Sequence, residues 1–335
     1  MKPATKRTVL ALLCVAALGL AALWGFRAWV LNLAAAPGGA AKLVEIPRGS
    51  GQAAVAELLA REGIIAKPLW FLAAARFTQE AGPLKAGEYE LSPALSQEAI
   101  LAILRSGRVY QHVVLIPEGF TLQEIVDRLA EAGLVDRKAA LALAKDRAFL
   151  DSLDLTKAES LEGYLFPDTY RLARGLGARA VLGLMVRRGN QAWRPLEAKA
   201  TEMGFSRGQT LTLASIIEKE ARVDAERPLI SAVYHNRLKK GMLLQADPTV
   251  IYGLGGLDRP LLRADLEKDN PYNTYQRPGL PPGPICSPGE ASLLAAVDPA
   301  RVNYLYFVAD GSGRHVFSRD YAGQVAAIRE VRRRH

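Results

Sequence analysis

The chain is poor in the side chains that crosslink proteins and bind metal ions. Its 335 residues include only 2 cysteines and 4 histidines. Cys14 lies in an apolar run near the amino terminus and Cys286 lies far away in "GPICSPGE", so we expect no disulfide even in an oxidising compartment. The histidines at 112, 235, 315 and 335 show no spacing of a zinc site, and we expect no metal. The glycines of "GLGARA" (175–180) follow no buried strand, so we expect no dinucleotide or other cofactor.

One long segment near the amino terminus carries no charge. It runs from Thr8 to Phe26 and is close to the roughly 20 residues that a membrane-spanning helix needs. A cleaved signal peptide is the alternative, since "LAAAP" (33–37) offers a small-residue cleavage site. The apolar run, however, is longer than the roughly 7–15 residues typical of a signal peptide. Trp24 and Trp29 lie where an interfacial aromatic belt would lie. We predict a retained single-pass anchor.

The basic residues around this run predict its orientation. Lys2, Lys6 and Arg7 precede it, whereas only Arg27 follows it closely. The positive-inside rule then leaves the amino terminus in the cytoplasm and the bulk of the protein outside. The formal net charge of +9 would permit nucleic-acid binding. An exported domain meets anionic lipid and carboxylate-bearing wall polymer instead, so we expect no nucleic-acid partner.

An internal echo follows the small-residue linker "NLAAAPGGAA". The segments "VEIPRGSGQAAVAELLAREGII", from Val44, and "VLIPEGFTLQEIVDRLAEAGLV", from Val114, align without a gap at an offset of 70. Each predicts a short strand, a Pro-x-Gly turn and an amphipathic helix closed by glycine. Two copies are too few for a solenoid. Duplicated strand-helix modules that bind the cell wall fit better.

The remaining pattern mixes helices and strands without the regular alternation of a parallel sheet. Between the two copies we expect helices over 67–77 and 96–107 and a strand over 84–91. Further along, we expect helices over 197–205, 209–222 and 228–241. A hairpin is expected around Asp310-Gly311-Ser312-Gly313. We therefore predict an α+β fold.

The helix predicted at "LTLASIIEKEARVDAERP" (211–228) carries two acids beside its apolar stripe. At about 100° per residue, Glu218 and Glu220 flank the stripe on opposite sides, and Lys219 faces away. They could be boundary acids that reach solvent or pair with Arg222. The alternative is that one of them is half-buried for a chemical task. Periodicity leaves both interpretations open.

The surrounding motifs resemble one family. They are "LEGYLFPDTY" (161–170), "ASIIEKEA" (214–221), "VYHNRLKKGMLLQADPTVIYG" (233–253) and "NPYNTYQRPGLPPGPICSPGEASLLAAVDP" (270–299). In this order, and together with the anchor, they are similar to the endolytic murein transglycosylase (YceG-like) family from about Leu43 to the end. The resemblance implies an inner-membrane enzyme whose periplasmic part has a LysM-like domain followed by a catalytic domain. That domain would cut glycan strands of nascent peptidoglycan internally. Peptidoglycan synthases would be its partners.

The resemblance also implies the site. Glu218 would be the catalytic acid and Glu220 a supporting residue. A lytic transglycosylase uses no water, so one carboxyl group can protonate the glycosidic oxygen and then take the proton of the muramic acid 6-hydroxyl, which closes a 1,6-anhydro ring. An apolar wall of Ile217 and Ala214 is expected to favour the neutral acid that starts this reaction. The candidate sugar contacts are Tyr164, Asp168, Gln245, Asp247, Asn273 and Tyr275.

One departure and two alternatives accompany this interpretation. The family is expected to carry a Glu-His-Asn step after the final Tyr-Ala, where this chain has Gly323, Gln324 and Val325. We interpret the change as structural. A non-enzymatic wall-binding scaffold and a hydrolytic muramidase with Glu218 and Asp247 as a carboxylate pair are the alternatives. The predicted parts are a cytoplasmic tail (1–7), a transmembrane helix (8–30), a linker (31–42), a LysM-like domain (43–155) and a catalytic domain (156–335).

Overall fold

The chain consists of two compact units that are described separately. The computed structural model describes residues 3–78 and 82–334. The first unit contains residues 1–112 and 173–175, and the second contains residues 113–172 and 176–335. Helices and strands are mixed in both, which confirms the α+β class. The packing boundary falls between His112 and Val113. The domain boundary expected at 155, and the LysM-like identity of the module before it, stay predictions.

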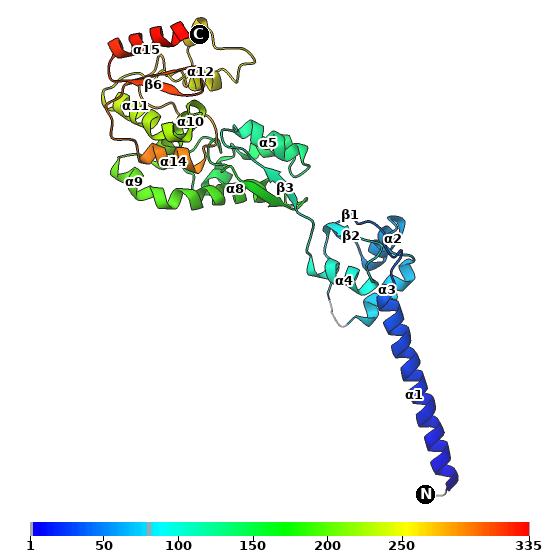
Figure 1. The fold of residues 1–335 in the computed structure, drawn as a ribbon. Coiled ribbons are helices and arrows are strands. Elements are labelled where there is room, and N and C mark those ends of the chain that lie inside the picture. Colours follow the sequence, from blue (N-terminus) through cyan, green and yellow to red (C-terminus); the bar gives the residue numbers. More distant parts are fainter. Residues whose placement is uncertain (1–2, 79–81, 335) are drawn as a thin grey trace. The chain divides into compact units, whose positions relative to one another are not determined.

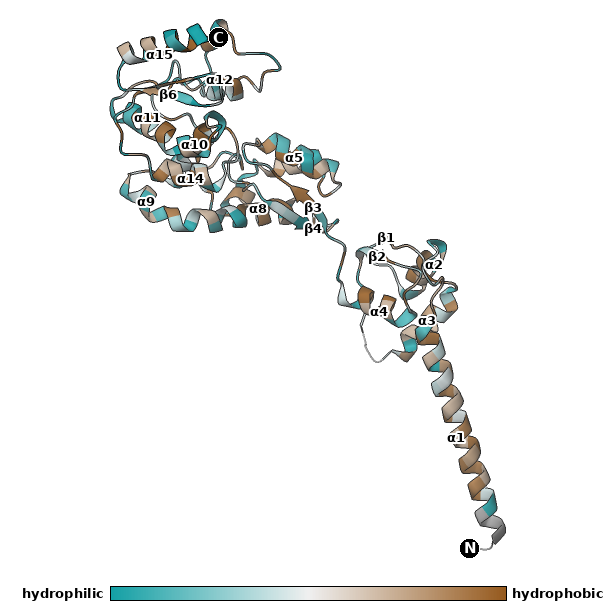
Figure 2. Cartoon of the chain, viewed as in Figure 1, coloured by the Kyte–Doolittle hydropathy of each residue, from teal (hydrophilic) through white to brown (hydrophobic). Residues whose placement is uncertain are grey.

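The uncharged amino-terminal segment forms one long helix, α1 (Pro3–Asn32). Within Arg7–Asn32, the most apolar 18 residues have a mean hydropathy of 2.4, and the stretch could cross a membrane by length and composition, although a signal sequence would pass the same test. Most of the helix is coloured as hydrophobic in Figure 2. Its last turns pack on the first unit, where the rings of Trp29 and Trp70 meet edge to face at 5.3 Å. Arg27 donates to the carbonyl of Phe77 at 3.2 Å.

The rest of the first unit is a two-stranded antiparallel sheet with three helices. Its elements are β1 (Lys42–Ile46), α2 (Gln52–Arg61), α3 (Pro68–Phe77), β2 (Gly87–Leu91) and α4 (Gln97–Ser106). β1 pairs with β2 so that Val44 lies opposite Tyr89, and both are buried. Ser96 caps α4, and Gly107 closes it with a left-handed φ of 71°. These elements match the helices and the strand expected from the sequence.

The two copies of the echo have the expected strand-turn-helix form but lie in different units. In the second copy, β3 (His112–Leu115) leads into α5 (Leu122–Glu131). The turn glycines, Gly49 and Gly119, have φ of 80° and 78°, which only glycine adopts without strain. β1 pairs with β2, whereas β3 pairs with β4 (Thr169–Leu172). The copies therefore share local structure and belong to separate cores.

The second unit holds most of the helices (Figure 1). After α5 come α6 (Arg137–Leu143), α7 (Arg147–Asp151), β4, α8 (Ala178–Trp193), α9 (Glu197–Glu202), α10 (Arg207–Glu220), α11 (Arg227–Lys239), α12 (Asp247–Gly253), α13 (Arg263–Leu266), α14 (Glu290–Val297), β5 (Tyr306–Ala309), β6 (His315–Ser318) and α15 (Tyr321–Arg334). β5 and β6 form the expected antiparallel hairpin around residues 310–313.

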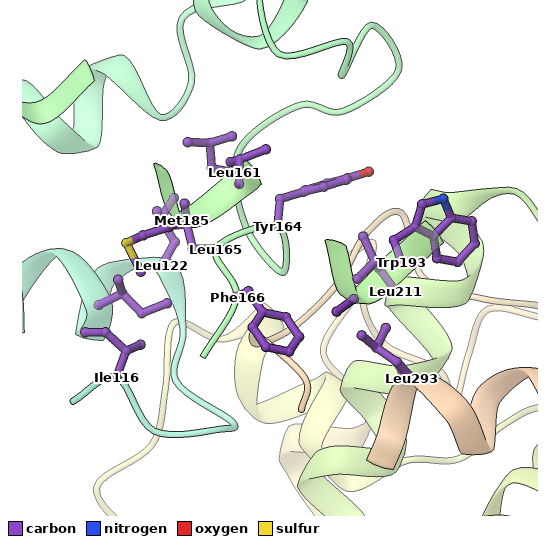
Figure 3. Close-up of a cluster of buried hydrophobic side chains, with 14 of the residues drawn as sticks. Ile116, Leu122, Leu161, Tyr164, Leu165, Phe166, Met185, Trp193, Leu211 and Leu293 are labelled. Atoms are coloured by element: carbon purple, nitrogen blue, oxygen red, sulfur yellow. The ribbon is translucent and has the colours of Figure 1, made fainter. Parts of the chain in front are cut away.

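The core of this unit gathers side chains that are far apart in sequence. Figure 3 shows the 161–166 segment in the middle of this core. Ile116, Leu122 and Met185 lie on one side of it, and Trp193, Leu211 and Leu293 lie on the other. Phe166, Leu211 and Leu293 are all buried there. The core therefore joins the second echo copy to the helices that carry the two acids.

Helix α10 lies at the centre of this arrangement. It begins with a capping box in which Ser206 and Gln209 bond each other's backbone N–H groups. Ser206 belongs to a Gly-x-Ser-x-Gly segment (204–208), but it follows a helix and its hydroxyl is engaged in the cap, so it is no nucleophile elbow. Residues 210–217 are buried, and α10 packs against α11 and α14. The helix is therefore held rigidly up to its last turn.

Candidate active site

Two carboxylates lie at the carboxyl end of α10, on opposite sides of its buried stripe. Glu218 and Glu220 are half-buried, whereas Lys219 between them is exposed. The helical periodicity therefore placed all three side chains correctly. The helix ends at Glu220 because Ala221 is extended, with φ −73° and ψ 126°.

The Glu218 carboxylate is held at both of its oxygens. Arg227, at the start of α11, approaches Oε1 at 3.2 Å, and the backbone N–H of Gly289 donates to Oε2 at 3.0 Å. Only 7% of the Glu218 side chain and 8% of the Arg227 side chain are exposed. Arg227 is itself fixed by a 2.9 Å bond from Nε to the hydroxyl of Ser292. This geometry fixes the position and orientation of the carboxylate.

Two loop segments close over Glu218. The N–H of Gly119 donates to the carbonyl of Ser287 at 2.9 Å, and the N–H of Ser287 donates to the carbonyl of Phe120 at 2.8 Å. A Cβ at Gly119 would lie 3.8 Å from Cγ of Glu218. The backbone pairing thus brings the Pro-x-Gly turn of the second echo copy against the acid.

Glu220 lies in a different environment on the other side of α10. Tyr234 of α11 donates its hydroxyl hydrogen to Glu220 Oε1 at 3.0 Å. The pKa of Glu220 is raised to about 7, mainly by burial and also by the nearby Asp247, while the Tyr234 bond and Arg237 oppose the shift. Within the described ranges Glu220 forms no salt bridge. It is therefore a hydrogen-bonded acid, and the ion pair suggested for a boundary acid belongs to Glu218 and Arg227 instead of Arg222.

Two of the expected sugar contacts, Asp247 and Tyr275, lie near Glu220, and Gln245 stands two residues before Asp247. The hydroxyl of Tyr275 donates to Asp247 Oδ1 at 2.5 Å, and Glu220 contributes to the raised pKa of Tyr275 after burial and Asp247. Gln245 and Asp247 are exposed and Tyr275 is half-buried. Gln245 has a φ of 52°, a strained value for a non-glycine residue. Strain of this kind is often found at functional sites.

Asn273 holds the loop that carries Tyr275. It is fully buried, and its amide group donates to the carbonyls of Leu266 and Lys268 at 2.9 and 2.8 Å. Its Oδ1 accepts the N–H of Tyr275 at 3.0 Å. The recorded contacts of Asn273 are thus to its own loop, and it positions Tyr275.

Tyr164 and Asp168 lie elsewhere in the second unit. Tyr164 is buried under the guanidinium of Arg207, 5.3 Å from its ring centre, and lines a cavity at the amino end of α10. Asp168 forms a 2.6 Å ion pair with Arg188. Among the described residues, neither forms a hydrogen bond or an ion pair with Glu218 or Glu220. The six expected sugar contacts therefore do not form one cluster.

The departure near the carboxyl end has a structural explanation. Gln324 lies in the first turn of α15, and its side chain donates to the carbonyl of Phe307 in β5 at 3.1 Å. Gly323 donates its N–H to Asp320 at 2.8 Å. Gln324 therefore links α15 to the hairpin, while Gly323 lies in the first turn of the helix and bonds to the residue that precedes it. Among the residues that the structure describes, no group of three or more His, Cys, Asp and Glu side chains is placed to hold a metal ion.

Sequence reasoning missed several members of the site. Arg227 stands nine positions beyond Glu218, and Gly289 is brought in only by the fold. Glu118 is an exposed acid whose carboxylate lies against Gly289. A signal for it existed in the echo, where the first copy has Arg48 at the equivalent position and the second has an acid.

Comparison with known proteins identifies relatives of this arrangement. The YceG-like family matches residues 44–330. An endolytic murein transglycosylase of Bacillus subtilis is 33% identical over 291 residues, which cover 82% of this chain and 81% of that protein. One from Streptococcus pneumoniae serotype 2 is 31% identical over 297 residues, covering 80% of this chain and 54% of that longer protein.

A solved structure agrees with these matches. The 2.6 Å crystal structure of a yceG-like protein from Listeria monocytogenes superposes with a TM-score of 0.60 and 34% identity, and covers 86% of this chain and 99% of its own. The family resemblance inferred from the motifs is thereby confirmed. Since the family match spans residues 44–330 and the relatives exceed 30% identity, this chain belongs to the YceG-like family.

Proposed function

We propose that this chain is a membrane-anchored endolytic lytic transglycosylase of peptidoglycan, with Glu218 as its catalytic acid. It cuts glycan strands between N-acetylmuramic acid and N-acetylglucosamine and leaves 1,6-anhydro ends. The observation that carries the proposal is the fixed, nearly buried Glu218 carboxyl at the end of α10. The relatives named endolytic murein transglycosylase support the substrate and the reaction.

The surroundings of Glu218 suit both halves of the reaction. In the first half the acid gives its proton to the glycosidic oxygen, and the bond from C1 to that oxygen breaks. The carboxylate that results is stabilised by Arg227 and by the N–H of Gly289. In the second half it accepts the proton of the muramic acid 6-hydroxyl as that oxygen bonds to C1. The nucleophile belongs to the same sugar, so the attack is effectively intramolecular.

The neighbouring polar residues hold the sugar. Gln245, Asp247 and Tyr275 offer donors and acceptors to hydroxyl and N-acetyl groups, and the exposure of Gln245 and Asp247 supports this role. Glu220 interacts electrostatically with Asp247 and Tyr275 and acts as a supporting residue. Substrate contacts of Tyr164, Asp168 and Asn273 stay predictions, and their recorded bonds favour structural roles.

The anchor places the reaction at the membrane. We infer an amino terminus in the cytoplasm and a catalytic part outside the cytoplasmic membrane, because basic residues precede the apolar helix. An enzyme held at the membrane where new glycan strands emerge contacts the strands away from their ends, so internal cuts are expected. Peptidoglycan synthases, which make those strands, are the partners expected there.

Product masses test the proposal. Purified glycan is digested with the full chain in detergent, and the fragments are analysed by mass spectrometry. A 1,6-anhydro end is lighter than a hydrolysed end by one water, about 18 mass units, because the attacking oxygen is intramolecular. Anhydro ends on long fragments are expected. Reducing ends would indicate a muramidase, and disaccharides released from strand ends would contradict internal cutting.

The muramidase alternative also meets a structural difficulty. It pairs Glu218 with Asp247, but the acid that Asp247 influences is Glu220, on the opposite side of α10. Asp247 is already bonded to Tyr275 at 2.5 Å. A base that activates water would have to face Glu218. The acid that lies beside Glu218 is Glu118, not Asp247.

A further inference from the structure

Glu118 is the acid that lies beside Glu218. It occupies the Pro-x-Gly turn between β3 and α5, and its side chain is exposed. A Cβ on Gly289 would overlap the Glu118 carboxylate, while the N–H of the same glycine donates to Glu218. One glycine therefore separates two carboxylates, of which one is nearly buried and the other faces solvent.

The Glu118 carboxylate is free. Among the described residues it forms no hydrogen bond and no ion pair, although both neighbouring backbones are engaged. An acid that served only to hold the turn would be bonded to it, as Glu124 is to Thr121 in the next cap. The turn is held by backbone bonds of Gly119 and Phe120 instead. The side chain is left available for a ligand.

The charges around Glu118 come from three elements. They are Glu218 and Lys219 of α10, Asp224 of the turn 224–226, and Arg227 of α11. The pKa of Glu118 is raised by burial and then by the charge of Glu218, and Arg227 opposes this. The two acids and the two basic residues around Glu118 balance each other, so the Glu118 carboxylate itself supplies the excess negative charge at this point of the site. A cationic group is what such an environment would stabilise.

We propose that Glu118 is a second catalytic carboxylate, which faces the sugar ring at the bond being cut and stabilises the positive charge that develops there. This rests on the proposed function. As the bond from C1 to the glycosidic oxygen breaks, its electron pair leaves with that oxygen, which receives the proton of Glu218. The ring then carries oxocarbenium character. Glu118 forms and breaks no bond, and the 6-hydroxyl gives its proton back to Glu218.

The electrostatic role has a physical basis. A preorganised charge aimed at the charge of a transition state contributes most where water is largely excluded, and loss of one such group costs about 100- to 1,000-fold in kcat. The positive charge on the sugar ring appears only in the transition state. Loss of the carboxylate that stabilises it therefore lowers kcat and leaves KM nearly unchanged. This separates the role from simple sugar binding, which would raise KM.

The first test compares three variants on purified glycan, with the rate of anhydro-end formation as readout. Glu118→Gln should lower kcat about 100-fold with KM within about threefold of wild type. Glu118→Asp, which keeps the charge, should be intermediate. Glu290→Gln, an exposed acid next to Gly289, is the matched control and should behave as wild type. A Glu118→Gln enzyme within about threefold of wild-type kcat would overturn the proposal.

The pH profile gives a second readout. Only the charged Glu118 can act, so the wild-type rate should fall as pH falls through its raised pKa. That acid limb should be absent in Glu118→Gln, which a purely structural role would not produce. If the wild-type chain forms no anhydro ends at all, the proposed function fails first. Anhydro ends with an unaltered acid limb would count against Glu118 alone.

A double-mutant cycle covers the case in which Glu118→Gln folds poorly. Gly289 has φ −76° and ψ 173°, which alanine adopts freely, so Gly289→Ala should act by displacing the Glu118 carboxylate. It should lower kcat in the wild type but change it less than twofold in Glu118→Ala, where the space is empty. An equal loss in both backgrounds would contradict the proposal.

Discussion

Arg227 and Tyr234, two turns apart on α11, each hold one acid of α10. Arg227 pairs with Glu218 at 3.2 Å, and Tyr234 bonds Glu220 at 3.0 Å. Residues at i and i+7 lie on one face of a helix, so a single face of α11 fixes both carboxylates. Glu218 contacts a guanidinium and a backbone N–H, whereas Glu220 accepts a hydrogen bond from a phenol hydroxyl. Their chemistry should therefore differ.

The two acids should respond differently to the same substitution. Glu218→Gln keeps the shape of the side chain but cannot transfer a proton, so we expect cleavage to fall by more than about 1,000-fold. Glu220→Gln should cost less than about tenfold, because the amide can still accept the Tyr234 hydroxyl. Release of anhydro-ended fragments measures both.

Folding is the control for this pair. Thermal unfolding of both variants should remain cooperative, and both should still bind intact glycan. Equal losses of activity in the two variants would remove the support for Glu218 as the acid.

The raised pKa of Glu220 predicts how stability depends on pH. Below the ordinary value of 4.5 the acid is protonated in both the folded and the unfolded chain. Between there and about 7 the folded chain keeps a proton that the unfolded chain releases. The free energy of unfolding therefore decreases as pH rises through this window, by up to about 3 kcal/mol from this group.

Denaturant unfolding at several pH values checks this dependence. Between pH 5 and pH 8 the free energy of unfolding should decrease less in Glu220→Gln than in the wild type. Glu162, whose pKa burial also raises to about 7, should leave a residual slope in that variant. A variant with the full wild-type slope would show that Glu220 titrates normally.

Arg227 should be needed for folding as well as for catalysis. Its loss leaves the nearly buried Glu218 carboxylate with only the N–H of Gly289 and removes the partner of Ser292. Breaking a buried pair at one end costs about 3 kcal/mol. Arg227→Met should therefore shift the denaturant midpoint strongly downward, and adding Glu218→Gln should recover much of the loss. No recovery would mean that the guanidinium stabilises through other contacts.

The sequence predicted local features of this site better than long-range ones. Periodicity placed Glu218 and Glu220 correctly, because the angle between side chains on a helix is fixed. It could not identify Arg227, because that contact depends on how the chain turns after Ala221. Gly289 comes from a loop with no periodicity at all.

Other residues illustrate the same limit. Asn273 reads as a polar loop residue, and only the fold reveals that it is buried and bonded to its own loop. The strand-turn-helix form of both echo copies follows from local signals such as Pro-x-Gly. Their assignment to different cores depends on which strands pair. The sequence predicted no buried strand before the glycines of 175–180, and this was wrong, because β4 lies there, buries Tyr170 and Leu172 and pairs with β3.

Topology can be tested on the intact chain. A reporter fused after His335 that is active only outside the cytoplasm should be active, since the basic cluster lies before the apolar helix. The same reporter type fused ahead of Thr8 should be silent. Activity of a cytoplasm-only reporter after His335 would reverse the assigned orientation. Release of the protein from membranes by salt or alkali would instead favour a cleaved signal sequence.

Gln245 offers a test in which stability and activity separate. Its φ of 52° is strained, its backbone N–H bonds the carbonyl of Thr274 at 3.1 Å, and its side chain is exposed. Glycine at this position would relieve about 1 kcal/mol of strain and add a similar entropy to the unfolded chain. Gln245→Gly should therefore leave the thermal midpoint nearly unchanged. If the side chain binds sugar, KM for glycan should rise about tenfold, the value of one or two lost hydrogen bonds.

The matched control is the second non-glycine residue with such a backbone. Asp154 has a φ of 59° and is exposed in the loop after α7, and within the described part of the chain it bonds to neither acid of α10. Asp154→Gly also relieves strain in the folded chain and adds entropy to the unfolded chain. Its thermal midpoint should therefore stay near that of the wild type, and its KM should be unchanged. A rise in KM confined to Gln245→Gly would assign the effect to the lost amide. An unchanged KM in both variants would mean that the strain at Gln245 serves the geometry of the loop, and that Asp247 and Tyr275 hold the sugar without it.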